Sequence, residues 1–145
     1  MKESRLMVEI LGGADAGVPA ADLIKDVTEE TFMPEVVDAS MEVPVIVDFW
    51  APWCGPCKTL GPMLEAAVTR AKGAVRMAKV NVDENQRLVA ALSQQGLPLQ
   101  SLPTVVAFYQ GRPLDMFQGA QPQSEIEAFL KRIAEAAGGT ADGGL

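Results

Sequence analysis

The sequence predicts an α/β fold in which a mixed sheet of four to five strands is flanked by about four helices. Short apolar segments of strand length alternate with segments whose apolar residues recur at helical spacing. They follow the order β-α-β-α-β-α-β-β-α, so helices separate the early strands and allow parallel connections between them. The last two strands are adjacent along the chain, which favours an antiparallel hairpin. A sheet with both kinds of pairing, covered by helices, follows from this order.

The N-terminal part is predicted to hold a flexible arm, a short strand and a short helix. Residues 1–22 are rich in glycine, alanine and aspartate and form the predicted arm. Residues 23–27 have the composition of a short strand. Thr31 is placed to cap a helix that runs to Val37. Pro34 fits in the first turn of that helix, where no hydrogen bond needs its missing N–H.

The middle of the chain is predicted to form a central strand followed by a long helix. Residues 43–50 are nearly all apolar, with Asp48 as the one charge, and such a run suits a strand covered on both faces. From Cys54 onward the apolar residues follow helical spacing. Pro62 is expected to kink this helix because it lacks an N–H for the helical ladder, and Gly73 is expected to end it.

A second interior strand and a short helix are predicted next. Residues 75–83 carry the apolar positions of a strand. Leu88, Val89 and Leu92 then follow the spacing of a short helix, which Gly96 is expected to close.

The C-terminal part is predicted to contain the hairpin and a final helix. Its strands, Thr104–Tyr109 and residues 114–118, flank the turn sequence at 110–113. Ser124 and Glu127 have the spacing of a capping box, in which each side chain accepts an N–H of the first helical turn. The final helix is therefore expected to begin at Ser124.

Composition and charge narrow the class of protein. The 145 residues suffice for one domain, placed at 23–137 between the arm and a glycine-rich flexible tail or truncated linker at 138–145. The net charge of −7, without a basic cluster, argues against binding of nucleic acid or an anionic membrane. No stretch approaches the ~20 apolar residues of a membrane helix, and the first residues do not read as a secretory signal. A cytoplasmic protein is therefore expected.

Chemistry is expected at the two cysteines of the chain, Cys54 and Cys57. The chain has no histidine, which excludes nucleophilic systems that depend on a histidine base. Cys54 follows a strand and opens a helix, where unpaired N–H groups and the helix dipole stabilise a thiolate. Cys57 lies one turn further along, close enough to form a disulfide and more sheltered. The pattern indicates a nucleophilic cysteine and a resolving cysteine.

Two alternatives to redox chemistry stay open for the cysteine pair. A zinc site needs four ligands, and the chain offers no second pair and no histidine, so such a site would have to be shared between two chains. The second alternative is a pair of buried, inert cysteines, which would leave their strand-to-helix placement and the flanking Trp53 and Pro56 as coincidence. Redox chemistry is favoured, and no metal is expected.

The residues around the cysteines resemble those of a known family. The run DFWAPWCGPCK at 48–58 is similar to the active-site strand and loop of thioredoxins almost residue for residue. Further blocks follow in the family's order: KVNVD at 79–83, LPT at 102–104 before a strand, and Gly119 after the last strand. The resemblance covers residues 23–137 and implies a thioredoxin fold and a thiol–disulfide oxidoreductase.

The resemblance implies catalytic roles for four residues. Cys54 is expected to attack a substrate disulfide, and Cys57 to resolve the mixed disulfide that results. Asp48 corresponds to the family's buried carboxylate, which accepts the proton of Cys57. Burial raises the proton affinity of a lone aspartate, as a base near neutral pH requires. Lys79 corresponds to the partner of that carboxylate, with a surface lysine on a strand edge as the alternative.

A substrate groove is also implied. Pro103 corresponds to the proline that is cis in thioredoxins, and the backbone of Leu102 to the segment that pairs with the bound substrate. Trp53 and Gly119 would form flat apolar walls of this groove. Gly55 and Pro56, between the two cysteines, would complete it.

The resemblance further implies the partners of the reaction. No bound cofactor is expected, because electrons would come from NADPH through a thioredoxin reductase. Protein disulfides would be the substrates, and a monomer is the default expectation.

Two departures from ordinary thioredoxins point to a second function. Residues 94–101 look longer than the usual connection, which would place Leu97 and Leu99 near the groove. Residues 112–122 resemble the corresponding segment of proteobacterial chaperedoxins, which are co-chaperonins with a thioredoxin domain followed by tetratricopeptide helices. The alternative function is therefore a redox-active holdase head that protects client cysteines by mixed disulfides and, in a longer protein, meets a chaperonin.

Overall fold

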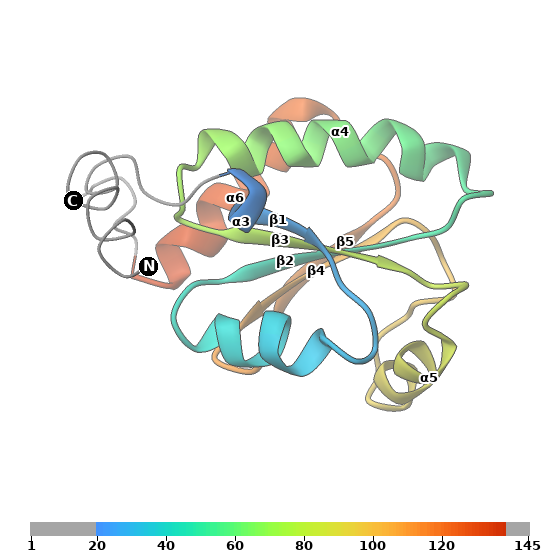
Figure 1. Ribbon diagram of the computed structural model, residues 1–145. Coiled ribbons are helices and arrows are strands. Elements are labelled where there is room, and N and C mark those ends of the chain that lie inside the picture. Colours follow the sequence, from blue (N-terminus) through green and yellow to red (C-terminus); the bar gives the residue numbers. More distant parts are fainter. Residues whose placement is uncertain (1–19, 139–145) are drawn as a thin grey trace.

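Five strands form one mixed sheet at the centre of the molecule (Figure 1). A computed structural model describes residues 20–138, so most of the predicted arm at 1–22 and of the tail at 138–145 lies outside the described residues. The sheet has the order β1-β3-β2-β4-β5. Its first three strands are parallel, and β4 and β5 are antiparallel to their neighbours. The strands are β1 (Ile24–Asp26), β2 (Val45–Trp50), β3 (Arg76–Asn81), β4 (Thr104–Tyr109) and β5 (Arg112–Gln118).

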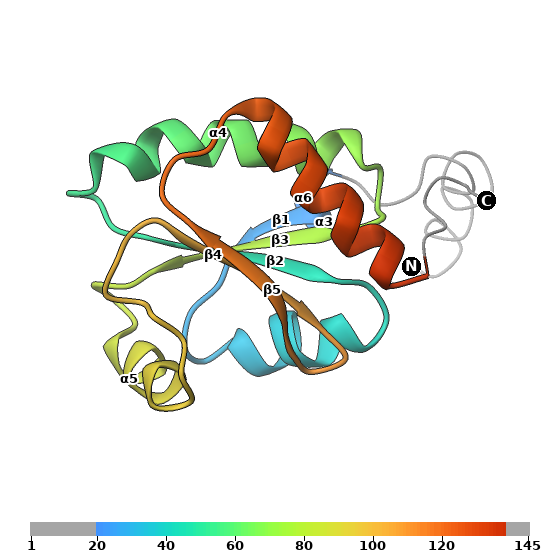
Figure 2. The same ribbon diagram turned by 180° about the vertical axis from the view of Figure 1, so that it is seen from behind.

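Helices cover both faces of this sheet (Figures 1 and 2). One face carries α4 (Gly55–Arg70) and α6 (Gln123–Ala136). The other carries α5 (Gln86–Gln94) and a helical segment made of the π-helical η2 (Met33–Asp38) and the 3₁₀ turn η3 (Ala39–Met41). The mixed five-stranded sheet between two helical layers confirms the predicted fold class.

The central strand β2 is buried on both faces and divides the core into two clusters. Ile46 packs with α4 and α6 in the first cluster, whereas Val47 and Phe49 pack in the second, which includes the η2 side. Side chains alternate along a strand, so Asp48 lies on the same face as Ile46. The sheet register thereby turns this carboxyl toward α4.

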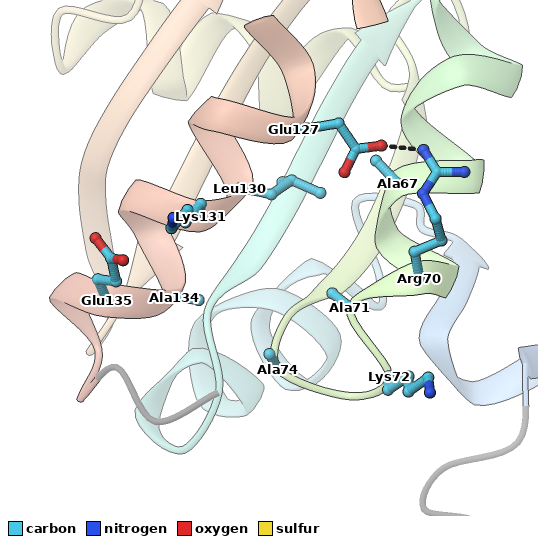
Figure 3. A pocket seen from close by; sticks show the side chains of 10 residues that line it. All are labelled: Ala67, Arg70, Ala71, Lys72, Ala74, Glu127, Leu130, Lys131, Ala134 and Glu135. Atoms are coloured by element: carbon cyan, nitrogen blue, oxygen red, sulfur yellow. Dashed lines mark hydrogen bonds and ion pairs between the residues drawn. The ribbon is translucent and has the colours of Figure 1, made fainter. Parts of the chain in front are cut away.

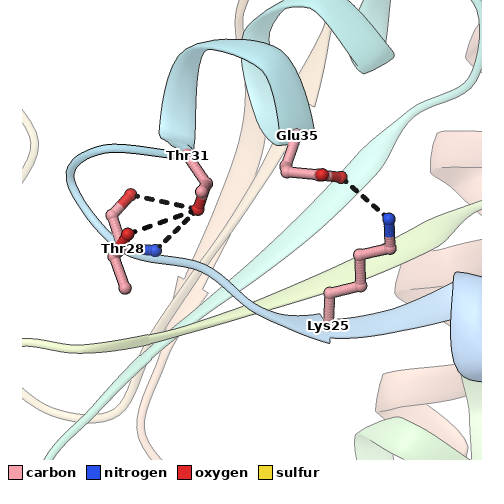
Figure 4. A network of polar contacts seen from close by, with 4 residues as sticks. All are labelled: Lys25, Thr28, Thr31 and Glu35. Atoms are coloured by element: carbon pink, nitrogen blue, oxygen red, sulfur yellow. Dashed lines mark hydrogen bonds and ion pairs between the residues drawn. The ribbon is translucent and has the colours of Figure 1, made fainter.

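The start of the described chain differs from the prediction. Leu23 ends a four-residue helix, α3 (Ala20–Leu23), and the strand begins at Ile24. Thr31 does not cap the following helix: its hydroxyl accepts the backbone N–H of Thr28 at 3.0 Å instead (Figure 4). A short local bond of this kind competes with capping, so the prediction was wrong. On the next turn, Glu35 pairs with Lys25 at 3.1 Å and ties the segment to β1.

The hairpin turn is tighter than predicted. Gln110 and Gly111 alone connect the strands, with φ of 56° and 84°, as a two-residue hairpin turn requires. Strand β5 therefore begins at Arg112 and includes Pro113. The pairing register shifts between Ala107 and Phe108, the latter being the partner of Pro113. Strand β5 is an edge strand, the place in a sheet where proline is tolerated.

The predicted capping box of the last helix was wrong. Helix α6 begins at Gln123, its N-cap is Pro122, and no side chain caps it. The carboxylate of Glu127 accepts no backbone N–H of the first turn; it accepts hydrogen bonds from Arg70 of α4 and from the side-chain amide of Gln123. A charged partner on the neighbouring helix outcompetes a local backbone N–H for this carboxylate.

Candidate active site

The two cysteines lie where β2 leads into α4. Cys54 is the N-cap residue of α4, with extended backbone angles, and Cys57 lies in the first turn. They form a disulfide, with Cα atoms 5.3 Å apart. The backbone N–H of Cys57 donates to Sγ of Cys54 at 3.2 Å. The helix terminus therefore directs a hydrogen-bond donor at the sulfur of the expected nucleophile.

Cys57 was expected to be less exposed than Cys54, and this prediction was wrong for the disulfide form of the protein. Each is 4% exposed, and both pack with Ala51 in a small cluster that Trp50, Val82 and Leu102 partly cover. The disulfide holds both sulfurs against the same apolar cover, so their burial is equal. What distinguishes them is the backbone: only the Cys54 sulfur accepts the N–H at the helix start.

Asp48 lies beneath α4 without a hydrogen-bonded cation. Its side chain is 1% exposed, and its Oδ1 atom has no hydrogen-bond partner among residues 20–138. A Cβ added at Gly61 would lie 4.0 Å from Oδ2, so the helix comes close to the carboxyl at this glycine. Gly61 follows Cys57 by one helical turn and shares its face of α4. Asp48 thus lies under the face that bears the resolving cysteine.

Burial raises the pKa of Asp48 from 3.8 to about 7. The positive charge of Lys79 opposes this rise, and the negative charge of Glu65 adds to it. A carboxyl with this pKa can exchange a proton near neutral pH.

Lys79 lies beside Asp48 in the sheet but donates its hydrogen bond elsewhere. The two residues are Cα partners of the parallel strands β2 and β3. The ammonium of Lys79 instead donates to Oε2 of Glu65 on α4 at 2.8 Å. This bond is the main cause that raises the pKa of Lys79. Lys79 therefore acts on Asp48 through its charge, whereas its direct partner is Glu65.

The residues expected to line a groove gather around the disulfide. Leu102 packs against the cysteines, and the Leu102–Pro103 peptide bond is cis, as predicted. Gly119, at φ +83°, donates its N–H to the carbonyl of Pro103 at 2.9 Å. Trp53 is 68% exposed, and its Nε1 donates to Oδ2 of Asp83 at 3.1 Å. The indole is thus anchored at one edge while its apolar surface stays accessible.

The connection before Pro103 does not bring both leucines to the groove. Leu99 is 4% exposed and belongs to the second core cluster, with Leu97 packed against that cluster. Their apolar side chains gain more from this core than from an exposed groove wall. Leu99, which was expected near the groove, is instead buried in the second core cluster.

The comparisons with known proteins agree with this geometry. The Thioredoxin family model matches residues 23–132. Thioredoxin 1 of Nostoc sp. is 41% identical over 106 residues, which are 73% of this chain and 92% of that protein. The chain belongs to the thioredoxin family.

Solved thioredoxin structures match the fold. A thioredoxin from Malassezia sympodialis has a TM-score of 0.64 and 32% identity, covering 77% of this chain and 90% of that one. A mutant thioredoxin from Halobacterium salinarum has a TM-score of 0.66 and 29% identity, covering 81% and 96%. With its Cys54–Cys57 pair, this thioredoxin-family chain is a protein-disulfide oxidoreductase.

Sequence reasoning missed two residues of this thioredoxin site. Glu65 follows Gly61 by four residues, so helical spacing alone would have put its carboxylate on the face that covers β2. Asp83 follows β3, and the carboxyl ends of neighbouring parallel strands meet at one edge, where Trp53 also lies after β2. Both spacings could be read from the sequence. Only the pairing of β2 with β3, however, shows that Glu65 lies over Lys79 and that Asp83 lies beside Trp53.

A groove of about 450 Å³ lies apart from the thioredoxin site, between α4 and α6 (Figure 3). Its floor is made by small and apolar residues such as Ala67 and Leu130, and the Arg70–Glu127 pair crosses its rim. None of its lining residues belongs to the cysteine site. Within residues 20–138, no group of three acidic, cysteine or histidine side chains could hold a metal ion, and no helix is long and apolar enough to cross a membrane.

Proposed function

We propose that this thioredoxin-family protein reduces disulfides of other proteins through a dithiol–disulfide cycle of Cys54 and Cys57. The Cys54 thiolate attacks one substrate sulfur, forms a mixed disulfide and releases the other substrate sulfur as a thiolate. Cys57 then loses its proton and attacks Sγ of Cys54, which releases the second substrate thiolate. The substrate gains two electrons, and the Cys54–Cys57 bridge forms.

The observation that carries this proposal is the position of the disulfide between a helix N-terminus and a buried carboxyl. The N–H of Cys57 points at Sγ of Cys54 and favours negative charge on that sulfur in the reduced protein. Asp48, under the same face of α4, is the acceptor for the proton of Cys57. Its raised pKa of about 7 suits both uptake and release of that proton.

Six residues around the cysteines form the proposed substrate groove. Gly55 supports this because a Cβ at its position would meet nothing within 4 Å, so the helix start is open to an approaching chain. The exposed indole of Trp53 offers an apolar surface beside Cys54. The proposed set is Trp53, Gly55, Pro56, Leu102, Pro103 and Gly119.

Membership of the thioredoxin family supports a proposal for the electron source and the cellular location. Thioredoxins need no bound cofactor, and we place NADPH with a thioredoxin reductase as the source that returns the disulfide to the dithiol. A monomer in the cytoplasm is part of the same proposal.

Reduction of insulin by dithiothreitol tests the proposed function. The protein should accelerate precipitation of the insulin B chain over dithiothreitol alone, and Cys54→Ser should abolish the acceleration. Mixed with insulin after dithiothreitol has been removed, reduced Cys57→Ser should instead accumulate a covalent adduct, because no second thiol is present to resolve the mixed disulfide. An unmodified protein that gives no acceleration would reject the reductase function.

A holdase head is the second candidate, favoured by the resemblance of residues 112–122 to chaperedoxins. It predicts that a variant with both cysteines changed to serine still suppresses aggregation of a heat-unfolded client enzyme. If that variant no longer suppresses aggregation of the client, the holdase function is rejected and the reductase function remains.

A further inference from the structure

Three ionisable side chains lie side by side on the face of the sheet that α4 covers. Asp26 of β1 is the Cα partner of Lys79 in β3, which in turn is the Cα partner of Asp48 in β2. Partners at the same level of a sheet point to the same face. Glu65 of α4 reaches down to the middle of this row, where Oε2 accepts the ammonium of Lys79 at 2.8 Å.

The row contains one cation, Lys79, between the carboxylates of Asp26 and Asp48, and Glu65 adds a third carboxylate that competes for it. Glu65 holds the ammonium at hydrogen-bond distance, while Oδ1 of the buried Asp48 has no partner in the described part of the chain. The Lys79 and Glu65 side chains are 29% and 35% exposed, whereas Asp48 is 1% exposed. The hydrogen bond between Lys79 and Glu65, both partly exposed to solvent, therefore holds the ammonium away from the buried carboxyl of Asp48.

We infer that Glu65 is a positioning residue of the proposed reaction: by holding the ammonium of Lys79, it keeps the Asp48 carboxyl able to accept the proton of Cys57. The inference rests on the proposed role of Asp48. It assigns to α4 both the resolving cysteine and the side chain that prepares its base.

The charged surroundings of Asp48 support this assignment. Helix α4 brings Glu65 and Cys57, strand β3 brings Lys79, and strand β1 brings Asp26, which acts on Lys79. Strand β4 places Val105 opposite Asp48. The buried residues of α6 are apolar: Ile126, Phe129, Leu130 and Ile133. Lys79 is thus the cation whose charge acts on Asp48, and Glu65 is the group that holds its ammonium at hydrogen-bond distance.

The direction of the effect follows from electrostatics. Without the carboxylate of Glu65, the ammonium of Lys79 is free to turn to Asp48 and stabilise its charged form. Loss of the nearby negative charge acts in the same direction. Asp48 should then release its proton at a lower pH.

Titration of the Asp48 carboxyl by ¹³C NMR in the oxidised protein tests the inference, because disulfide-bonded cysteines do not titrate. Glu65→Gln should lower the midpoint by at least about 0.5 pH unit. Glu30→Gln, which removes an equal charge at an exposed position, should leave the midpoint unchanged. In a Lys79→Met background, Glu65→Gln should produce less than half of the original shift.

Two results would overturn the inference: an unchanged midpoint in Glu65→Gln, or a full shift that persists without Lys79. The pH profile of insulin reduction is measured on the same proteins and should move to lower pH in Glu65→Gln. Insulin reduction by the unmodified protein keeps the two proposals separate. If the unmodified protein reduces insulin but the Asp48 midpoint does not move in Glu65→Gln, only the role of Glu65 is rejected.

Discussion

Asp48 shows how one residue couples stability to chemistry. Its carboxyl is buried and lacks a hydrogen bond at Oδ1 among the described residues, an arrangement that costs stability whenever the group is charged. The folded protein binds the proton up to about pH 7, whereas the unfolded chain releases it near pH 3.8. Between these values the folded state holds more protons, so its stability falls as pH rises.

Asp48→Asn is therefore expected to stabilise the oxidised protein at pH 8 by up to about 4 kcal/mol. The gain should shrink as pH falls, to below about 1 kcal/mol at pH 4, because the carboxyl of the unfolded chain, with a pKa of 3.8, is then partly protonated. Urea unfolding from pH 4 to pH 8 measures it, with Asp115→Asn as an exposed control. A gain that is independent of pH would contradict the raised pKa of Asp48.

At the scale of elements, the loop that leads into Pro103 is held by side chains of two strands. The hydroxyl of Thr104, fully buried, donates to the carbonyl of Ser101. Gln118 of β5 donates to the same hydroxyl at 2.9 Å and to the carbonyl of Pro98 at 2.8 Å. These bonds fix the end of the loop against the sheet and so set the position of Leu102 beside the cysteines.

Thr104→Val is expected to lower the free energy of unfolding by about 1–3 kcal/mol, because it keeps the shape but removes the two hydrogen bonds that the buried hydroxyl makes with Ser101 and Gln118. The KM for insulin should rise as the loop loosens, with a smaller effect on kcat. Thr104→Ser retains the hydroxyl and should preserve the KM. Equal KM values for the two variants would show that the hydroxyl does not position the loop.

For the whole molecule, one sheet joins two cores. Phe129 packs edge-to-face on Phe117 at 4.9 Å in the cluster under α4 and α6. Phe32 packs in the same manner on Phe108 at 5.7 Å on the opposite face. Strand β2 contributes to both clusters, so damage to either one weakens the shared sheet.

Phe129→Ala and Phe32→Ala should each lower the free energy of unfolding by about 3–5 kcal/mol. Because the sheet is shared, tryptophan fluorescence and far-ultraviolet circular dichroism should report one coincident transition in each variant. Phe129→Leu, a closer match in volume, should cost less. Separate transitions in Phe129→Ala would mean that α6 undocks independently of the sheet.

The order of elements, the fold class and the cysteine pair could be predicted from the sequence because each depends on local chemistry. Apolar period, turn residues and a CxxC between strand and helix act over a few neighbours. The thioredoxin-like blocks also indicated that Asp48, Lys79 and Pro103 belong near the cysteines. The predictions of helix caps were wrong, because the hydroxyl and carboxylate groups involved had other hydrogen-bond partners within reach. Thr31 bonded to Thr28, and Glu127 bonded to Arg70 on another helix rather than to a capping N–H.

By itself, the sequence determined which elements form and where thiol chemistry lies, because periodicity and the cysteine spacing belong to short segments. Only the tertiary structure decided which charges meet. Lys79 is next to Asp48 by sheet register, yet Glu65 of α4 takes its hydrogen bond. Leu99, expected near the groove, likewise lies in the second core cluster. Such choices depend on distances across strands and helices far apart in sequence, and on the burial that makes one partner stronger than another.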